Sequence, residues 1–256
     1  MKKSLKERIH KGEFTVGSWI TLGHTSVAEV MAQTGFDWLV VDMEHSAITL
    51  AEAQQLVQVI ELSGVTPLIR VNKNDSALIK QAMDIGAHGV IVPMVNTAQE
   101  ARDAVAAVNY PPLGKRGVGL ARAQKYGFGF EEYKKWLKKE SVVIVQIEHK
   151  DAVDNFEEIL SVPGVDGFIV GPYDLSGSLG VLGNFKHPLM VKYLRDIRRK
   201  AKLTKALAGF HVVKPDLKEF QKKKAEGYKF LAFSLDTLLL GSACRQIFRN
   251  KTNGGV

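Results

Sequence analysis

The chain of 256 residues contains a single cysteine, Cys244, so it has no internal disulfide and no thiolate cluster for a metal ion. It also lacks any apolar run approaching the about 20 residues of a membrane-spanning helix. The N-terminal segment MKKSLKERIHKGEF carries basic residues without the apolar stretch of a secretory signal. We therefore expect a cytoplasmic protein that does not insert into a membrane.

Several common functional motifs are missing. There is no P-loop, no GxGxxG dinucleotide turn, no GxSxG nucleophile elbow and no HExxH zinc motif. The formal net charge of +8 arises in helix-like stretches such as EEYKKWLKKE, where acidic and apolar residues are interspersed. No stacking aromatic residues or groove-reading motif accompany these charges. We interpret them as solvated helix faces rather than as a nucleic-acid site.

Apolar strand-like runs alternate with amphipathic helical segments along the whole chain. The strand candidates are Thr15–Ile20, Asp37–Val41, Thr66–Arg70, His88–Pro93, Val142–Glu148, Asp166–Pro172, Ala206–Phe210 and Lys229–Ser234. Eight strands in strict β–α alternation predict an α/β protein whose parallel sheet closes into a (β/α)8 barrel, a fold of about 250 residues. No linker or shift in composition divides the chain, so residues 1–256 are predicted to form one domain.

Two segments depart from this alternation. Residues 109–129 form the longest irregular stretch, and loops of this length usually have a function or a structure of their own. The final segment DTLLLGSACRQIFRN, residues 236–250, is predicted to be a helix that is too apolar to stand free in solvent. This helix must pack either on its own barrel or on a neighbouring subunit.

Charged and imidazole side chains gather where the predicted strands end. The strand WLVV is followed by Asp42, Met43, Glu44 and His45, and the third strand ends on Arg70. The other strand ends carry Trp19, Gln146, Glu148, Tyr173, Asp174 and His211. In a barrel these ends meet at one mouth, where TIM-barrel enzymes place their chemistry. Each residue alone has a structural explanation, such as a helix cap, but their convergence favours a catalytic site.

The residue types at this mouth predict enolate chemistry on a 2-oxo acid. Two carboxylates with few other ligands suit a hard divalent cation that keeps water or substrate oxygens in its shell. Asp42, three residues before His45, is placed to fix the tautomer of a histidine base. Arg70 provides a permanent positive charge where an oxyanion develops. The turn over residues 171–175 leads into a predicted short helix whose free N–H groups can hold a carboxylate.

A resemblance to a known family adds to this interpretation. The motifs GSW, FDWLVVDMEH, IRVN, IKQAMDIGAHGVIVPMV, YPPLGKRGVG, VQIE and GVDGFIVGPYDLSGSLG occur in order from about residue 12 to residue 183. Together they resemble the HpcH/HpaI aldolase family. The resemblance implies a TIM barrel of the phosphoenolpyruvate/pyruvate type and a class II aldolase, a lyase that reversibly cleaves a 4-hydroxy-2-oxo acid into pyruvate and an aldehyde. It implies Mg²⁺, Mn²⁺ or Co²⁺ as cofactor.

The resemblance also implies roles for individual residues. Glu148 and Asp174 match the metal ligands, His45 the catalytic base, Asp42 the partner of that base and Arg70 the arginine at the keto oxygen. Substrate contacts are implied for Trp19, Gln146, Tyr173 and Asp174, and for Asp84 in the site of an adjacent subunit; His211 is added because it ends a strand. The resemblance further implies a homohexamer whose C-terminal helices are exchanged between neighbouring barrels.

Three features depart from the family pattern: Tyr173 replaces a small residue, the segment HVVKPD follows the seventh strand, and the loop GVGLARAQKYGFG is short. All three are expected to shape the aldehyde half of the substrate.

One rival function keeps the same site for oxaloacetate decarboxylation or a citrate-synthase-like condensation. Another is a non-catalytic binding protein descended from the aldolases, which the intact set of site residues disfavours. A Schiff-base aldolase is disfavoured because the fifth and sixth strands contain no lysine.

Overall fold

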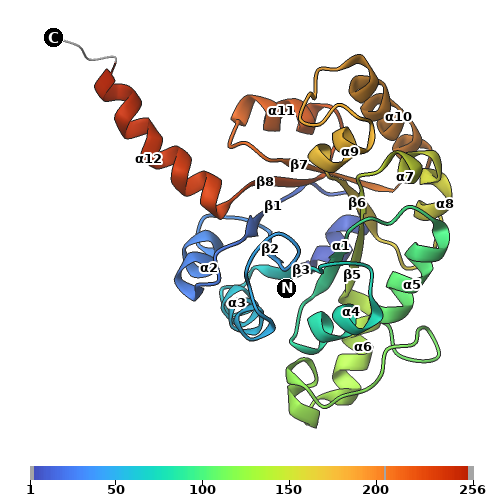
Figure 1. Cartoon of the computed structure of the whole chain (residues 1–256). Helices are drawn as coiled ribbons and strands as arrows, with labels where there is room; N and C mark the ends of the chain where they lie inside the picture. The colour runs from blue at the N-terminus through green and yellow to red at the C-terminus, as the bar shows by residue number, and fades with distance from the viewer. Residues whose placement is uncertain (1–2, 205, 253–256) are drawn as a thin grey trace.

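A computed structural model describes residues 3–204 and 206–252, and its eight parallel strands close into a barrel in sequence order (Figure 1). The strands are β1 (Thr15–Ile20), β2 (Trp38–Asp42), β3 (Thr66–Arg70), β4 (Gly89–Val92), β5 (Val142–Ile147), β6 (Gly167–Val170), β7 (Leu207–Val212) and β8 (Phe230–Leu235). The predicted (β/α)8 barrel is confirmed. The strands are apolar on both faces because one face meets the barrel interior and the other meets the helices.

Most of the helices surround this barrel on the outside (Figure 1). The helices in chain order are α1 (Leu5–His10), α2 (Thr25–Ala32), α3 (Leu50–Leu62), α4 (Ser76–Asp84), α5 (Ala98–Val108), the 3₁₀ helix η1 (Arg122–Gly127), α6 (Phe130–Glu140), α7 (Lys150–Asp154), α8 (Phe156–Leu160), α9 (Pro172–Ser178), α10 (Pro188–Thr204), α11 (Leu217–Ala225) and α12 (Asp236–Thr252). The long irregular stretch therefore has structure of its own, since η1 lies within it. No helix in the described part of the chain is long and apolar enough to cross a membrane.

Large side chains fill the interior of the barrel below the mouth. The rings of Trp38 and Phe230 stack there with their centroids 4.0 Å apart. Gly17 makes room for Trp38, because a Cβ at position 17 would lie 2.1 Å from the indole ring. Leu5 and Ile9 of α1 belong to the same buried cluster, so α1 closes the end of the barrel opposite the mouth. The packed interior gives the strand ends a rigid base.

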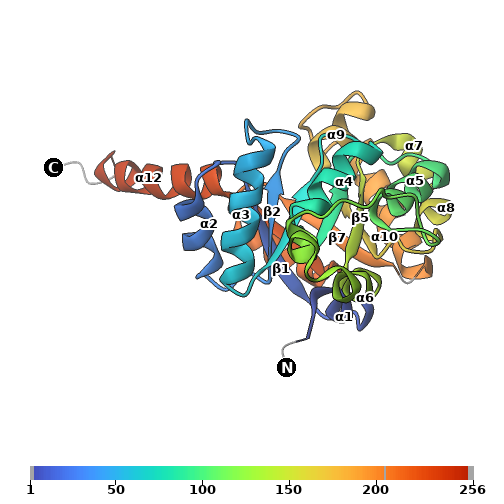
Figure 2. The same cartoon turned by 90° about the horizontal axis from the view of Figure 1, so that it is seen from below.

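The C-terminal helix α12 leaves the barrel instead of packing along it (Figures 1 and 2). Its first turn is tied down by Asp236, which accepts hydrogen bonds from the backbone N–H groups of Thr21 and Leu22, each at 2.8 Å. Farther out, the side chains of Leu240 and Ile247 are exposed by 61% and 62%. The sequence predicted that this helix packs either on its own barrel or on a neighbouring subunit. In the structure, α12 does not pack along its own barrel.

Candidate active site

The predicted strand-end residues come together around a cavity of about 170 Å³ at the mouth of the barrel. Its lining includes Trp19, His45, Arg70, Gln146, Tyr173, Asp174 and His211. Asp42 and Glu148 lie beneath this surface and are exposed by only 2% and 3%. Neither Asp42 nor Ser46 caps the next helix, because α3 begins at Leu50 with Thr49 as its cap. The acidic turn after β2 is therefore not explained by helix capping.

Asp42 and Arg70 form a bidentate ion pair at the base of the cavity. Arg70 donates from Nε and Nη2 to the two carboxylate oxygens of Asp42, at 2.9 and 2.6 Å. Burial alone would raise the pKa of Asp42, but the guanidinium outweighs it and holds the pKa below its usual range. The guanidinium also lies 4.4 Å from the ring centroid of Trp19. Arg70 is thereby fixed in one orientation.

His45 is oriented differently from the sequence-based prediction. Its backbone N–H donates to Asp42 at 3.2 Å, but the carboxylate of Asp42 is directed at Arg70. The imidazole Nε2 instead lies 3.7 Å from Oε2 of Glu44, and the side chain is 61% exposed at the mouth. The carboxylate that this imidazole contacts is therefore that of Glu44 and not that of Asp42.

Glu44 is the residue whose importance the sequence did not reveal. Its Oε2 lies 3.2 Å from Nη1 of Arg70. Burial raises the pKa of Glu44 to about 7; Arg70 opposes this rise, and the nearby charges of Asp42 and Asp174 reinforce it. Its place between Asp42 and His45 was the available signal, but we predicted no role for a further carboxylate from the sequence.

Glu148 is held by a backbone group and a neighbouring amide. Oε1 accepts a hydrogen bond from the backbone N–H of Met94 at 2.8 Å, and Oε2 accepts one from Nε2 of Gln146. Met94 adopts φ 51°, a left-handed conformation that is uncommon for residues other than glycine and often marks a functional site. Burial raises the pKa of Glu148 to about 7, and the charges of Asp174 and Glu44 add to the rise.

Four carboxylates, those of Asp42, Glu44, Glu148 and Asp174, thus gather with one guanidinium at this mouth and leave an excess of negative charge. Gly171 makes room for the carboxylate of Glu148, because a Cβ at position 171 would lie 2.6 Å from Oε2. Within residues 3–204 and 206–252, no three His, Cys, Asp or Glu side chains converge on a single metal position. Glu148 and Asp174 offer carboxylate oxygens, which are the ligands of a hard cation that completes its shell with water and substrate oxygens.

His211 forms one wall of the cavity as a neutral imidazole. Burial lowers its pKa to about 3, and the nearby charge of Arg70 acts in the same direction. Nε2 lies 3.2 Å from the backbone oxygen of Ser234, so this nitrogen carries the proton and donates. The ring also lies against Trp19, with the centroids 5.2 Å apart. These contacts fix both the tautomer and the orientation of His211.

Asp84 is the predicted site residue that does not reach this cavity. It ends α4, near the amino ends of the strands and away from the mouth. Its carboxylate pairs with Nη2 of Arg116 at 2.5 Å. The chain therefore does not bring Asp84 to its own site.

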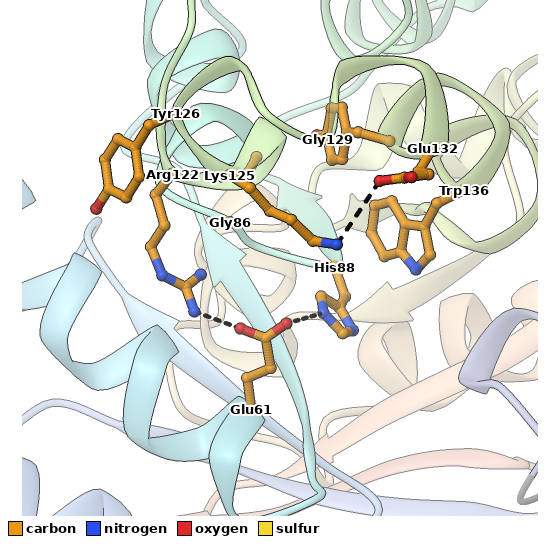
Figure 3. A pocket seen from close by; sticks show the side chains of 11 residues that line it. Glu61, Gly86, His88, Arg122, Lys125, Tyr126, Gly129, Glu132 and Trp136 are labelled. Atoms are coloured by element: carbon orange, nitrogen blue, oxygen red, sulfur yellow. Dashed lines mark hydrogen bonds and ion pairs between the residues drawn. The ribbon is translucent and has the colours of Figure 1, made fainter.

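A larger cavity of about 510 Å³ lies near the amino end of β4 (Figure 3). Glu61 lies between Arg122 and His88 there, and their hydrogen bonds, that of His88 first, lower the pKa of Glu61 to about 2. The ring of His88 packs edge-on against Trp136, with the centroids 4.9 Å apart. Glu61 thus pairs with both His88 and Arg122. We interpret this cluster as the anchor that holds η1 against α3.

These features are those of a TIM-barrel enzyme with carboxylates and an arginine at the mouth of the barrel. The chain belongs to the HpcH/HpaI aldolase/citrate lyase family, whose profile matches residues 15–243. It is 38% identical to 2-keto-3-deoxy-L-rhamnonate aldolase of Escherichia coli K12 over 259 residues, which covers 99% of this chain and 96% of that protein.

Solved structures of the same family agree with this assignment. An HpcH/HpaI aldolase/citrate lyase family protein from Burkholderia cenocepacia J2315 superposes with a TM-score of 0.90 at 32% identity, covering 97% of this chain and 98% of that one. The HpcH/HpaI aldolase from Desulfitobacterium hafniense DCB-2 gives a TM-score of 0.88 at 31% identity, covering 97% and 96%. The resemblance seen in the sequence motifs is thereby confirmed.

Proposed function

We propose that this protein is a divalent-metal-dependent (class II) aldolase that reversibly cleaves a 4-hydroxy-2-oxo acid into pyruvate and an aldehyde. The observation that carries the proposal is the convergence of a clamped arginine, Arg70, with Glu44, Glu148 and Asp174 around one small cavity. Similarity to 2-keto-3-deoxy-L-rhamnonate aldolase over nearly the whole chain supports the same class of reaction.

Glu148 and Asp174 would hold the metal ion, with Mg²⁺, Mn²⁺ and Co²⁺ as candidates. Burial raises the pKa of Glu148, the charges of Asp174 and Glu44 add to the rise, and a bound cation would oppose these effects. Carboxylate oxygens are the ligands that hard divalent ions prefer. When bound, such an ion supplies Lewis acidity at the 2-oxo group of the substrate.

The protein's own side chains account for the remaining steps. Asp42 occupies Nε and Nη2 of Arg70, and Nη1 lies 3.2 Å from Oε2 of Glu44. We assign to Nη1 the stabilisation of the negative charge that develops on the keto oxygen, a contact that would replace the one with Glu44. We assign to His45 the removal of the C4 hydroxyl proton, since its exposed imidazole stands at the entrance.

The other cavity residues would hold the pyruvate half of the substrate. Gln146 and the first turn of α9, with the backbone of Tyr173 and Asp174, would bind its carboxylate. The walls formed by Trp19 and the neutral His211 are apolar toward this position and would limit access of water to the enolate.

Pyruvate release from a panel of 4-hydroxy-2-oxo acids, followed with lactate dehydrogenase, tests this function. Oxaloacetate decay is measured in parallel, with and without a chelator. Metal-dependent release of pyruvate plus an aldehyde is the expected result. Turnover of oxaloacetate alone, or condensation of oxaloacetate with an acyl donor alone, would assign the site to one of the rival reactions. No reaction with any of these compounds would favour a binding protein.

The assembly we propose is a closed homohexamer with exchanged C-terminal helices. Leu240 and Ile247 on α12 are exposed in the single chain, and a partner barrel would cover them. Asp84, remote from its own site, would then approach the site of an adjacent subunit.

A further inference from the structure

A second cavity adjoins the active-site cavity. It has a volume of about 670 Å³ and lies between α10 and α11, the helices seen on either side of α9 in Figure 1. The two cavities share Pro172, Tyr173, His211 and Val213 in their linings. A molecule bound at the mouth therefore needs to extend only past Tyr173 to enter the larger space.

Apolar side chains form much of the wall of this cavity. Phe185, Met190, Leu194 and Phe210 line it. The ring of Phe185 packs edge-on against Tyr173, with the centroids 4.9 Å apart and the planes at 88°. This pair lies where the two cavities meet, and Tyr173 is 39% exposed. A hydrocarbon segment that leaves the mouth would pass beside these two rings and remain out of water.

Positive charge predominates in the lining of this cavity. Its five cations are Lys186, Arg198, Lys214, Lys222 and Lys223, and its three carboxylates are Asp216, Glu219 and Glu226. Two of the carboxylates already have partners. Asp216 accepts the backbone N–H groups of Lys218 and Glu219 at the start of α11, at 2.8 and 3.2 Å. Glu226 binds Arg198 at 2.9 Å and Lys223 at 3.2 Å.

Two of the cations stand at the end of the cavity nearest the active site. Lys214 follows β7 in the loop before α11, and Lys186 lies in the loop between α9 and α10. Both loops are at the carboxyl ends of the strands, as is the catalytic mouth. None of the ion pairs within residues 3–204 and 206–252 involves Lys186 or Lys214. Their charges are therefore available to a ligand.

We propose that this second cavity, bounded by Lys186, Lys214 and the Tyr173–Phe185 pair, binds the acceptor end of the substrate and selects aldehydes that carry a carboxylate or phosphate on an apolar linker. This inference rests on the aldolase function proposed above. The reaction is unchanged: the C4 hydroxyl loses its proton, the C3–C4 bond breaks, its electron pair becomes the enolate, and a proton added at C3 completes pyruvate. The cavity contributes by holding the anionic end of the departing aldehyde.

Matched aldehydes in the condensation direction test the proposal. With saturating pyruvate and Mg²⁺, 5-oxopentanoate is compared with its neutral isostere 5-oxopentanamide, and glyceraldehyde 3-phosphate with glyceraldehyde. The wild-type enzyme should show a lower KM for the anionic member of at least one pair. Added salt should reduce this preference, because screening is strong beyond about 8 Å at physiological ionic strength. The pair with the larger difference identifies the anionic group that the cavity prefers.

The double variant Lys186→Gln/Lys214→Gln locates the preference. Its KM for the preferred anionic aldehyde should rise about three- to tenfold, as expected for contacts with two exposed charges, with kcat and the KM values for the neutral aldehydes little changed. Lys135→Gln on the exposed face of α6 is the control and should behave as wild type. Thermal unfolding of both variants confirms that they are folded.

The outcomes separate this inference from the proposed function. Equal KM values within both pairs, or a preference that survives in the double variant, would overturn the acceptor site while leaving the aldolase intact. Failure to condense pyruvate with any of the four aldehydes would overturn both. An anionic preference that disappears in the double variant but persists in Lys135→Gln supports the assignment.

Discussion

Asp42 and Arg70 are register partners at the ends of adjacent strands β2 and β3, and their side chains form a two-point ion pair. This pairing determines what each residue can do. Arg70 is held by these two hydrogen bonds before any substrate arrives, and its third nitrogen, Nη1, lies 3.2 Å from Oε2 of Glu44, so the guanidinium is preorganised. We therefore propose that Asp42 is a positioning residue for Arg70.

Asp42→Asn tests this positioning role. The amide retains the shape but loses the charge and one acceptor oxygen, so Arg70 should become mobile. We expect kcat for both aldol cleavage and oxaloacetate decarboxylation to fall by about tenfold to a hundredfold, since small displacements of an oxyanion partner have effects of this size. Asp103→Asn on the exposed face of α5 is the matched control. Loss of cleavage alone would show that Asp42 acts through His45 instead.

His45 and Arg70 should differ in which reactions they affect. His45→Ala should reduce aldol cleavage by about 10²–10⁴-fold, the usual contribution of a positioned base, and largely spare oxaloacetate decarboxylation, which has no hydroxyl proton to remove. Arg70→Ala should impair both reactions by a similar factor, corresponding to about 3–4 kcal/mol. Both reactions are measured on both variants at saturating metal. Equal loss of the two reactions in His45→Ala would refute this division of roles.

His211 predicts how stability depends on pH. Burial lowers its folded-state pKa to about 3 from 6.5, so the unfolded chain binds the proton more tightly and stability falls as pH drops below 6.5. Between pH 7.5 and pH 5, protonation of this group should lower the free energy of unfolding by about 2 kcal/mol. His211→Gln keeps a donor for Ser234 but cannot titrate. In chemical denaturation, the free energy of unfolding of this variant should fall by about 2 kcal/mol less than that of the wild type over this pH range. If the two proteins lost stability equally as the pH falls, the result would argue against a buried neutral imidazole.

The exposed face of α12 predicts a closed oligomer in solution. Light scattering should give a single species several times the mass of the 28.2 kDa chain, six times for the proposed hexamer. The double variant Leu240→Glu/Ile247→Glu should shift the protein to smaller species because buried charges destabilise the contact. Leu203→Glu, at an exposed apolar position on α10, is the control. A stable wild-type monomer at micromolar concentration would contradict this assembly.

Much of the fold could be predicted because parallel strands in a barrel are recognisable as short apolar runs between amphipathic helices. Strands β1 and β3 have the predicted bounds, β5 begins at the predicted Val142, and the other strand ends differ by one or two residues. The helical segment between β5 and β6, by contrast, is divided into two short helices, α7 and α8, which are separated at Asn155. Hydrophobic periodicity does not resolve such a break because the same face stays buried in both helices.

The composition of the site was also predictable, but its pairing was not. The parallel topology alone brings Arg70, Glu148 and His211 to one mouth. That Asp42 faces Arg70 depends on the register between β2 and β3, and a shift of one residue would turn its side chain to the other face. The bond from Met94 to Glu148 uses a backbone N–H in a left-handed conformation, and no side-chain pattern encodes it.

Exchange of the methyl protons of pyruvate in D₂O tests the central claim most directly, because it reports enolate formation without requiring the aldehyde to be known. Followed by NMR, wild-type protein with Mg²⁺, Mn²⁺ or Co²⁺ should accelerate the exchange, chelation should abolish it, and restored metal should recover it. Glu148→Gln should remain folded, with no exchange and no stabilisation by added metal. Exchange that persists after exhaustive chelation, or exchange by Glu148→Gln at the wild-type rate, would contradict a metal-dependent pyruvate site at this mouth.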